Sequence, residues 1–232
     1  MVDLLSYLVI IFGYIAPPIF VAGMIWRIWN YKRYPTGFDW AVQPQPTENT
    51  FVNVMWRAFA WPTLFKGDRL LWISAMVFHI SILVLAMGHL GLFVDMVAFS
   101  GKLGISKDAT YAFGILSGST AMIALLIFIA RRIWITKVKI VSTFADYFWL
   151  IILLAVIVVG LYARIADEAS SEVVREFARN LWSFQPEMPP AHTWFLIHTF
   201  LAEIFLIYAV VGKPIHLVGQ FFTQYIMTSE RR

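Results

Sequence analysis

The sequence predicts an all-α integral membrane protein: a five-helix bundle with its N-terminus outside and its C-terminus in the cytoplasm. The 232 residues are 60% hydrophobic and 17% aromatic, and the mean hydropathy is +0.72. Soluble domains are only about half apolar and about a quarter charged. Five apolar runs each approach the roughly 20 residues that cross about 30 Å of hydrocarbon. These runs are 4–26, 70–94, 111–130, 145–163 and 193–213.

The orientation follows from the basic residues between the runs. The segments 27–69, 131–144 and 213–232 hold 13 Lys and Arg residues, whereas 95–110 and 164–192 hold 5. Cytoplasmic loops carry the excess of Lys and Arg. The segments 27–69, 131–144 and 213–232 are therefore predicted to face the cytoplasm, in a multi-pass protein of the cytoplasmic membrane. We expect one domain over residues 1–232.

The segments outside the five runs predict few further elements. The first run has no basic residues before it and no small-residue cleavage pattern, so it is expected to be a retained span rather than a signal peptide. Residues 51–69 mix aromatic and basic side chains and suit a helix lying in the inner interface. Residues 170–190 suit a helix on the outer surface that ends at Pro189 and Pro190, or a plain connecting loop.

The chain contains no cysteine. Disulfides, cysteine-held iron-sulfur clusters and a covalently attached c-type haem are therefore excluded for this chain. Any redox centre must be held by other side chains.

All five histidines lie on the second and fifth apolar segments or at their ends. An ionisable group at membrane depth is a functional candidate, and two facing pairs favour ligands over packing residues. The histidines are His79 and His89 on the second segment, and His192, His198 and His216 on the fifth.

Spacing and topology predict how these histidines pair. His79 and His89 are separated by about 15 Å along a helix and about 80° around it. On an uninterrupted helix His198 and His216 share one stripe, about 27 Å apart. Because the two segments run in opposite directions, His89 should pair with His198 near the outer face and His79 with His216 near the cytoplasm. The midpoints of the pairs would be about 21 Å apart, and the unequal spacings imply a bend, for which Pro214 is the candidate.

Two opposed imidazoles, present twice in an apolar interior, favour bis-histidine haem b. Zinc usually takes four ligands, often with thiolate or carboxylate among them. Haem iron needs only two protein ligands, and such a closed iron transfers electrons without binding substrate. Gly88 and Gly91 beside His89 either let the flat macrocycle approach or pack against another helix. His192, six residues before His198, is either an interfacial residue or part of an outer quinone pocket.

At these histidines the chain resembles the cytochrome b gamma subunit of respiratory nitrate reductase and its relatives. The shared frame is two histidines with nine residues between them on the second helix and two histidines with seventeen residues between them on the fifth, here FHISILVLAMGH and IHTFLAEIFLIYAVVGKPIH. The resemblance covers essentially the whole chain. Within this superfamily, MWRAFAWPTLFKGDR and EFARNLWSFQPEMPPAHTWFLIH are similar to the DsrM branch, the membrane cytochrome of the sulfite-reduction-associated Dsr complex. The HdrE cytochrome of heterodisulfide reductase is also similar.

The resemblance implies two haems b and a menaquinol site. By that resemblance His89 and His198 hold the outer haem iron, and His79 and His216 the inner one. The quinol pocket would lie beside Gly88 and His89.

The resemblance also implies partners and a direction of electron flow. Electrons from menaquinol would reach a cytoplasmic iron-sulfur subunit similar to DsrK, HdrD or NarH, in a complex with further subunits. A basic residue after the second helix contributes to the quinol pocket in the nitrate reductase relatives, and Lys107 is the nearest match here. A DsrM-like role would be reduction of disulfide or trisulfide sulfur compounds, and nitrate reduction is the alternative.

Three charged residues have two interpretations each. Glu203 departs from the family pattern as a carboxyl deep in the fifth span. Because a buried carboxylate is costly, it either hydrogen-bonds a neighbouring helix as a neutral acid or belongs to a proton path. Arg131 and Arg132 set the topology, or they contact haem propionates or an acidic partner.

Two other classes of protein stay open. A proton or metal-ion transporter would use the histidines as its path, but such proteins show repeats or interrupted helices, and neither is evident in the sequence. A structural anchor for a soluble enzyme would leave four inward histidines at matched depths unexplained. A haem spectrum distinguishes both from the cytochrome.

Overall fold

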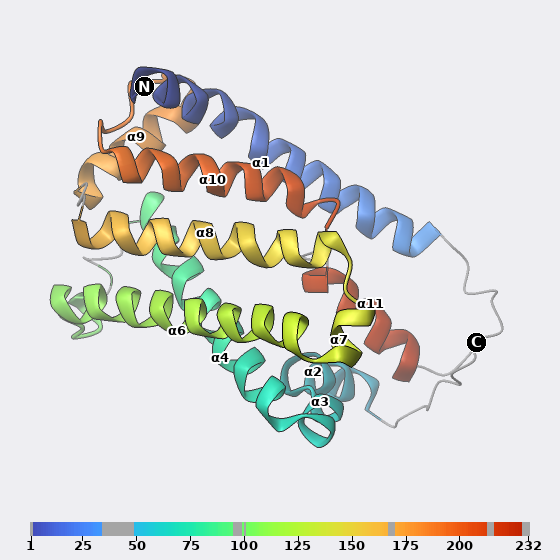
Figure 1. The fold of residues 1–232 in the computed structure, drawn as a ribbon. Helices are drawn as coiled ribbons and strands as arrows, with labels where there is room; N and C mark the ends of the chain where they lie inside the picture. Colours follow the sequence, from blue (N-terminus) through green and yellow to red (C-terminus); the bar gives the residue numbers. More distant parts are fainter. Residues whose placement is uncertain are drawn as a thin grey trace. The chain divides into compact units, whose positions relative to one another are not determined.

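A computed structural model of the chain describes residues 2–33, 49–94, 99, 101–166, 170–212 and 216–228. Every regular element in these ranges is a helix, which confirms the all-α prediction for them (Figure 1). Four of the helices are long and apolar enough to cross a membrane. They are α1 (Val2–Arg33), α4 (Arg69–His89) with the 3-10 turn η1 (Leu90–Leu92), α6 (Lys107–Trp134) and α8 (Phe144–Ala166).

The fifth predicted span is shorter than expected. Helix α10 (Thr193–Ala209) has 17 residues, a turn follows it, and a separate helix α11 (His216–Thr228) comes next. Gly212 in the turn and Pro214 after it both oppose a continuous helix. Pro214 itself, the predicted bend, lies outside the described residues. The count of five spans and the sides on which the termini lie stay predictions.

The two non-spanning segments are helical but differ from the expectation. Residues 51–69 form two helices, α2 (Thr50–Ala60) and α3 (Pro62–Gly67). They are separated at Trp61, which has a φ of 44° and precedes the proline that opens α3. Helix α9 (Ser171–Trp182) ends seven residues before Pro189. Phe184, with a φ of 57°, ends the helical path, so the two prolines are not the cause.

The chain divides into two compact units. The first comprises Met1–Pro18 and Ser74–Ile207, and the second comprises Ile19–Ile73 and Tyr208–Arg232. The single domain expected over residues 1–232 stays a prediction.

The first unit contains two apolar cores. One joins α1, α9 and α10 through Val9, Leu181 and Leu196. The other joins α6 and α8 through Leu125 and Ile157, with apolar side chains of α4 packed against it. Helices α4 and α6 also share a polar contact, because Ser81 Oγ and Thr120 Oγ1 lie 2.8 Å apart. The first unit thus contains the start of α1, α4 from Ser74 onward, α6, α8, α9 and most of α10.

The second unit packs α2 against α11. The rings of Phe59 and Phe221 meet edge to face, with their centroids 5.9 Å apart. Trp72 Nε1 donates a 2.8 Å hydrogen bond to the carbonyl of Ala60, which ties the start of α4 to the end of α2.

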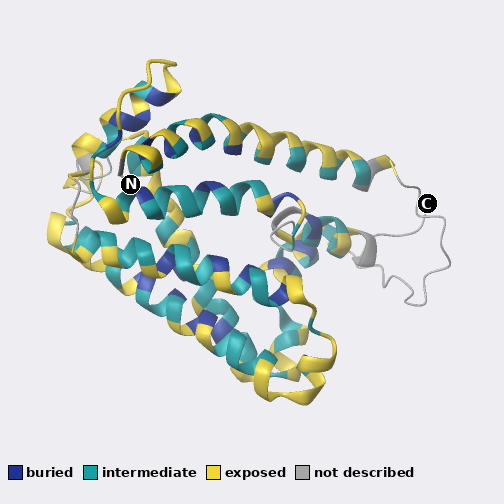
Figure 2. Cartoon of the chain, turned by 45° about the horizontal axis from the view of Figure 1, so that its top comes forward, coloured by how far each residue is buried: buried dark blue, intermediate teal, exposed yellow. Residues whose placement is uncertain are grey.

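Large apolar side chains remain exposed along the spanning helices (Figure 2). Leu83 on α4, Leu116 on α6 and Ile151 on α8 are examples, each with more than half of its surface accessible. An apolar outer surface of this kind suits hydrocarbon as its solvent.

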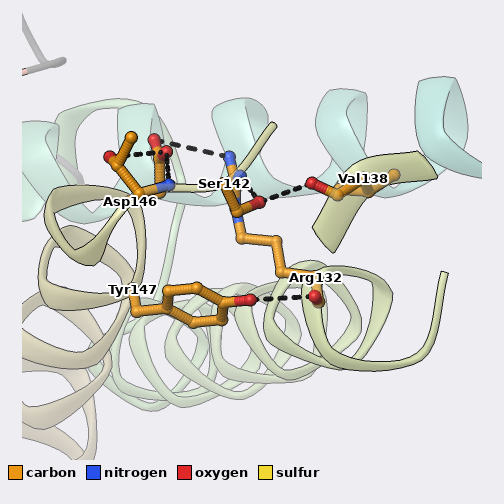
Figure 3. Close-up of polar contacts among 6 residues, drawn as sticks. Arg132, Val138, Ser142, Asp146 and Tyr147 are labelled. Atoms are coloured by element: carbon orange, nitrogen blue, oxygen red, sulfur yellow. Dashed lines mark hydrogen bonds and ion pairs between the residues drawn. The ribbon is translucent and has the colours of Figure 1, made fainter. Parts of the chain in front are cut away.

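A polar cluster joins the ends of α6 and α8 (Figure 3). Asp146, only 2% exposed, accepts hydrogen bonds from the main-chain N–H and the hydroxyl of Thr143 at 2.8 and 3.0 Å. Its other oxygen lies 3.9 Å from Arg132 Nη2. Arg132 also donates to Ser142 Oγ at 2.7 Å, and its carbonyl accepts from the hydroxyl of Tyr147. The cluster caps the first turn of α8, as an acid at the third helical position does in a capping box.

We predict that Asp146→Ala destabilises the protein by about 1–3 kcal/mol, because it leaves buried donors without an acceptor. Asp108→Ala is the matched control, since Asp108 is an exposed acid in the first turn of α6. Thermal unfolding of the purified protein in detergent measures both. Equal midpoints for the two variants would contradict the assignment.

Candidate functional site

The structure brings His89 of α4 and His198 of α10 together inside the first unit. Their ring centroids lie 6.0 Å apart, with an angle of 29° between the ring planes. A metal–imidazole bond is about 2 Å long and the ring nitrogen lies about 1 Å from the centroid, so two imidazoles on opposite sides of one ion have centroids about 6 Å apart. The observed separation therefore fits one metal ion held between the two rings.

Main-chain carbonyls fix the orientation of both rings. His89 Nδ1 donates to the carbonyl of Leu85 at 2.7 Å, and His198 Nδ1 donates to the carbonyl of Val156 at 2.9 Å. A carbonyl only accepts, so each Nδ1 carries the proton and each Nε2 carries a lone pair. Metal-binding histidines in proteins are usually held in this way.

Gly160 lets His198 lie directly against α8. A Cβ at this position would come within 2.7 Å of His198 Cε1 and 2.8 Å of its Nδ1. Next to it, the rings of Tyr162 and Trp194 meet with centroids 4.6 Å apart, so α8 and α10 are in close contact here. The sequence analysis did not single out Gly160. The available signal was an isolated glycine inside an apolar helix.

The surface beside His89 is open in the structure. Gly88 and His89 are both exposed, and a Cβ on Gly88 would meet no atom within 4 Å. The described residues therefore give Gly88 no helix to pack against. This favours the interpretation in which the glycine allows a flat group to approach the backbone.

The second predicted pair lies in two different units. His79 belongs to the first unit and His216, the first residue of α11, to the second. His79 Nδ1 donates to the carbonyl of Ala75 at 2.8 Å, as His89 does to its own helix. The expected single stripe for His198 and His216 is wrong, because the helix that carries His198 ends at Ala209. The pairing of His79 with His216 stays a prediction.

Helix α9 contacts η1, just beyond His89. Arg175 Nε donates a 3.0 Å hydrogen bond to the carbonyl of Gly91, and the rings of Phe93 and Trp182 lie 6.4 Å apart. Arg175 thus places a basic side chain at Gly91, which is two residues after His89. The sequence analysis missed Arg175, because it comes from a segment 84 residues away in the chain.

The other candidate residues lie in different surroundings. Lys107 is exposed in the first turn of α6. His192 is half-buried before α10, and its carbonyl accepts from the N–H of Leu196. Arg131 is half-buried. The contacts of Arg132 with Asp146 and Ser142 support its structural role between α6 and α8.

The structure shows an all-helical chain with four helices that could cross a membrane and a close pair of histidines between two helices. No group of three or more His, Cys, Asp or Glu side chains comes together within the described ranges. The family model described as nitrate reductase gamma subunit matches residues 51–230. The chain belongs to this family, as the resemblance predicted.

Curated relatives share most of the chain. The "Hdr-like menaquinol oxidoreductase cytochrome b-like subunit" of Archaeoglobus profundus is 27% identical, over 90% of this chain and 75% of the relative. The protein of the same name from Archaeoglobus fulgidus is 28% identical, over 92% of this chain and 78% of the relative. The "Nitrate reductase-like protein NarX" of Mycobacterium tuberculosis is 28% identical over 83% of this chain, which spans 33% of that longer protein.

We predict that Gly160→Ala lowers the unfolding free energy by about 1–3 kcal/mol, the usual cost of overpacking a filled interface. The methyl group must displace the His198 ring from the Val156 carbonyl. Gly67→Ala is the control, since a Cβ there meets nothing within 4 Å. An unfolding curve for Gly160→Ala that matches the control would show that His198 is not held at this position.

Proposed function

We propose that this chain is the membrane cytochrome b subunit of a quinol-oxidising respiratory complex, taking electrons from menaquinol near the outer face and delivering them, through two bis-histidine haems b, to a cytoplasmic iron-sulfur partner. The observation that carries the proposal is the pair His89 and His198, with rings 6.0 Å apart. Each ring also presents its Nε2 as the basic nitrogen.

The residues fit a haem better than a bare metal ion. Two imidazoles complete the coordination of a haem iron, and a closed iron of this kind supplies one-electron transfer. In the proposal His89 and His198 hold the outer group, and His79 and His216 hold the inner one. Arg131 and Arg132 are candidates for contact with propionates.

The proposed quinol pocket lies beside the outer pair. Gly88 and His89 would line it, with Lys107 and His192 as further candidates. Arg175 lies close to this end of α4 through its bond to Gly91. A quinol releases two protons and two electrons when it is oxidised, so donors and acceptors are needed beside it.

Electron delivery to the cytoplasmic side requires an acceptor of sufficient potential. In the predicted orientation, inward movement of electrons opposes an inside-negative potential by about 2.3 kcal/mol per charge per 100 mV. Relatives named Hdr-like menaquinol oxidoreductase subunits support a DsrM-like role, with a disulfide or trisulfide as the terminal acceptor and a DsrK- or HdrD-like partner. The family name and NarX support the alternative, a nitrate reductase gamma subunit with a NarH-like partner.

The first test is the haem content of the membrane complex. We expect about two haems b per chain by pyridine haemochrome, and reduction of these haems by a menaquinol analogue. A complex without haem would refute the cytochrome proposal and leave the transporter and the structural anchor as the remaining hypotheses. If haem is present but the menaquinol analogue does not reduce it, quinol oxidation is refuted and the cytochrome assignment is kept.

Single histidine variants test the ligands. We predict that His89→Ala and His198→Ala each reduce the haem count from about two to about one per chain, because each removes one axial ligand of the same iron. His79→Ala and His216→Ala should lose the other haem, with a different spectrum. His192→Ala is the control and should keep both haems.

A further inference from the structure

Glu203 is a buried carboxyl that the proposed function leaves without a role. It lies on α10, five residues after His198, and is only 7% exposed. Its Oε2 has no hydrogen-bond partner within the described part of the chain. Oε1 lies against α1, at 3.3 Å from the position that a Cβ on Gly13 would occupy. The carboxyl therefore faces the backbone of α1 where that backbone has no side chain.

Helix α1 has an unusual main-chain group at this point. A helix carbonyl accepts from the N–H four residues later, and for Gly13 that residue is Pro17. The next residue, Pro18, also lacks an N–H. The Tyr14 carbonyl has lost the Pro18 donor but can still reach the N–H of Ile19. The Gly13 carbonyl has thus lost its regular main-chain donor to Pro17, and Pro18 removes the next N–H along the helix as well.

The surroundings make this carbonyl costly to leave alone. Gly13 is buried, and Leu181 Cδ2 lies only 2.8 Å from its would-be Cβ. Phe12 and Phe200 form an edge-to-face contact at 5.4 Å beside it. An unpaired polar group in such a place destabilises the folded state. Proline is tolerated in membrane helices because neighbouring groups satisfy the freed carbonyls.

We propose that Glu203, as a neutral carboxylic acid, donates its O–H to the Gly13 carbonyl and so replaces the donor that Pro17 lacks. A carboxylate at this position would place two acceptors against each other, whereas the acid provides the single donor that is needed. The bond joins α1 to α10. Glu203 is then a positioning residue for the helix that carries His198.

The experiment is a double-mutant cycle between Glu203 and Pro17. Glu203→Leu replaces the carboxyl with methyl groups and so removes the donor, and we expect it to lower the unfolding midpoint by about 5 °C. Glu203→Gln keeps a donor and should retain most of the stability. Pro17→Ala restores the N–H for the Gly13 carbonyl, so in this background Glu203→Leu should cost much less. An infrared C=O band of a carboxylic acid should be present in the native protein and absent from Glu203→Gln.

Thr199→Val is the matched control on the same helix. Its hydroxyl donates to the carbonyl of Phe195 within α10, so its effect should be the same with and without Pro17→Ala. A cost for Glu203→Leu that does not depend on Pro17 overturns the proposal. So does a Glu203→Gln variant as unstable as Glu203→Leu. Native stability of Glu203→Leu, with slowed quinol turnover and an altered pH profile in Glu203→Gln, would also overturn the proposal and would assign Glu203 to a proton path.

The unfolding measurements need no haem or quinol, so they stand apart from the proposed function. Because His198 lies on the same helix, the haem spectrum is a second readout, and this one does rest on the proposed function. Glu203→Leu should alter the spectrum of the haem assigned to His89 and His198 and leave the other haem unchanged. If the purified complex contained no haem, this spectral readout would be lost, but the double-mutant cycle on stability would still test the proposal.

Discussion

Every main-chain carbonyl and N–H of a helix in hydrocarbon must find its partner inside the protein. In the first unit this constraint also organises the polar side chains. Three half-buried polar side chains bond to main-chain carbonyls: Thr120 to Leu116, Tyr14 to Leu181 and His198 to Val156. These three polar groups are thus oriented by the backbone around them.

The two histidines of the pair are held differently. His89 bonds to Leu85 on its own helix, so its orientation is set by α4 alone. His198 bonds across to Val156 on α8 and lies against Gly160. The separation of the two rings therefore depends on three helices, α4, α8 and α10. A change in the packing of α8 would act directly on the hydrogen bond of His198, whereas the hydrogen bond of His89 lies within α4.

Helix α9, which is too short to span a membrane, packs at the end of the first unit that carries His89. Helix α9 buries Phe177 and Leu181 against α1 and α10, and its Arg175 bonds to the carbonyl of Gly91 beyond His89. The hydroxyl of Tyr14 on α1 bonds to the carbonyl of Leu181 in α9. These contacts connect α1, η1 and α10, and they bring a cation from a distant part of the chain close to the predicted quinol site.

The sequence by itself determined the helical class, four of the spans and the four histidine candidates, because hydrocarbon demands long apolar runs and makes polar residues within them conspicuous. It did not place the end of α10, because the apolar run 193–213 continues through the turn at residues 210–212. Nor could it find Gly160, Arg175 or the contact between Glu203 and Gly13, which join segments far apart in the chain. Only the tertiary structure decided these, because a close approach between helices depends on how they pack and leaves no periodic mark in either sequence segment.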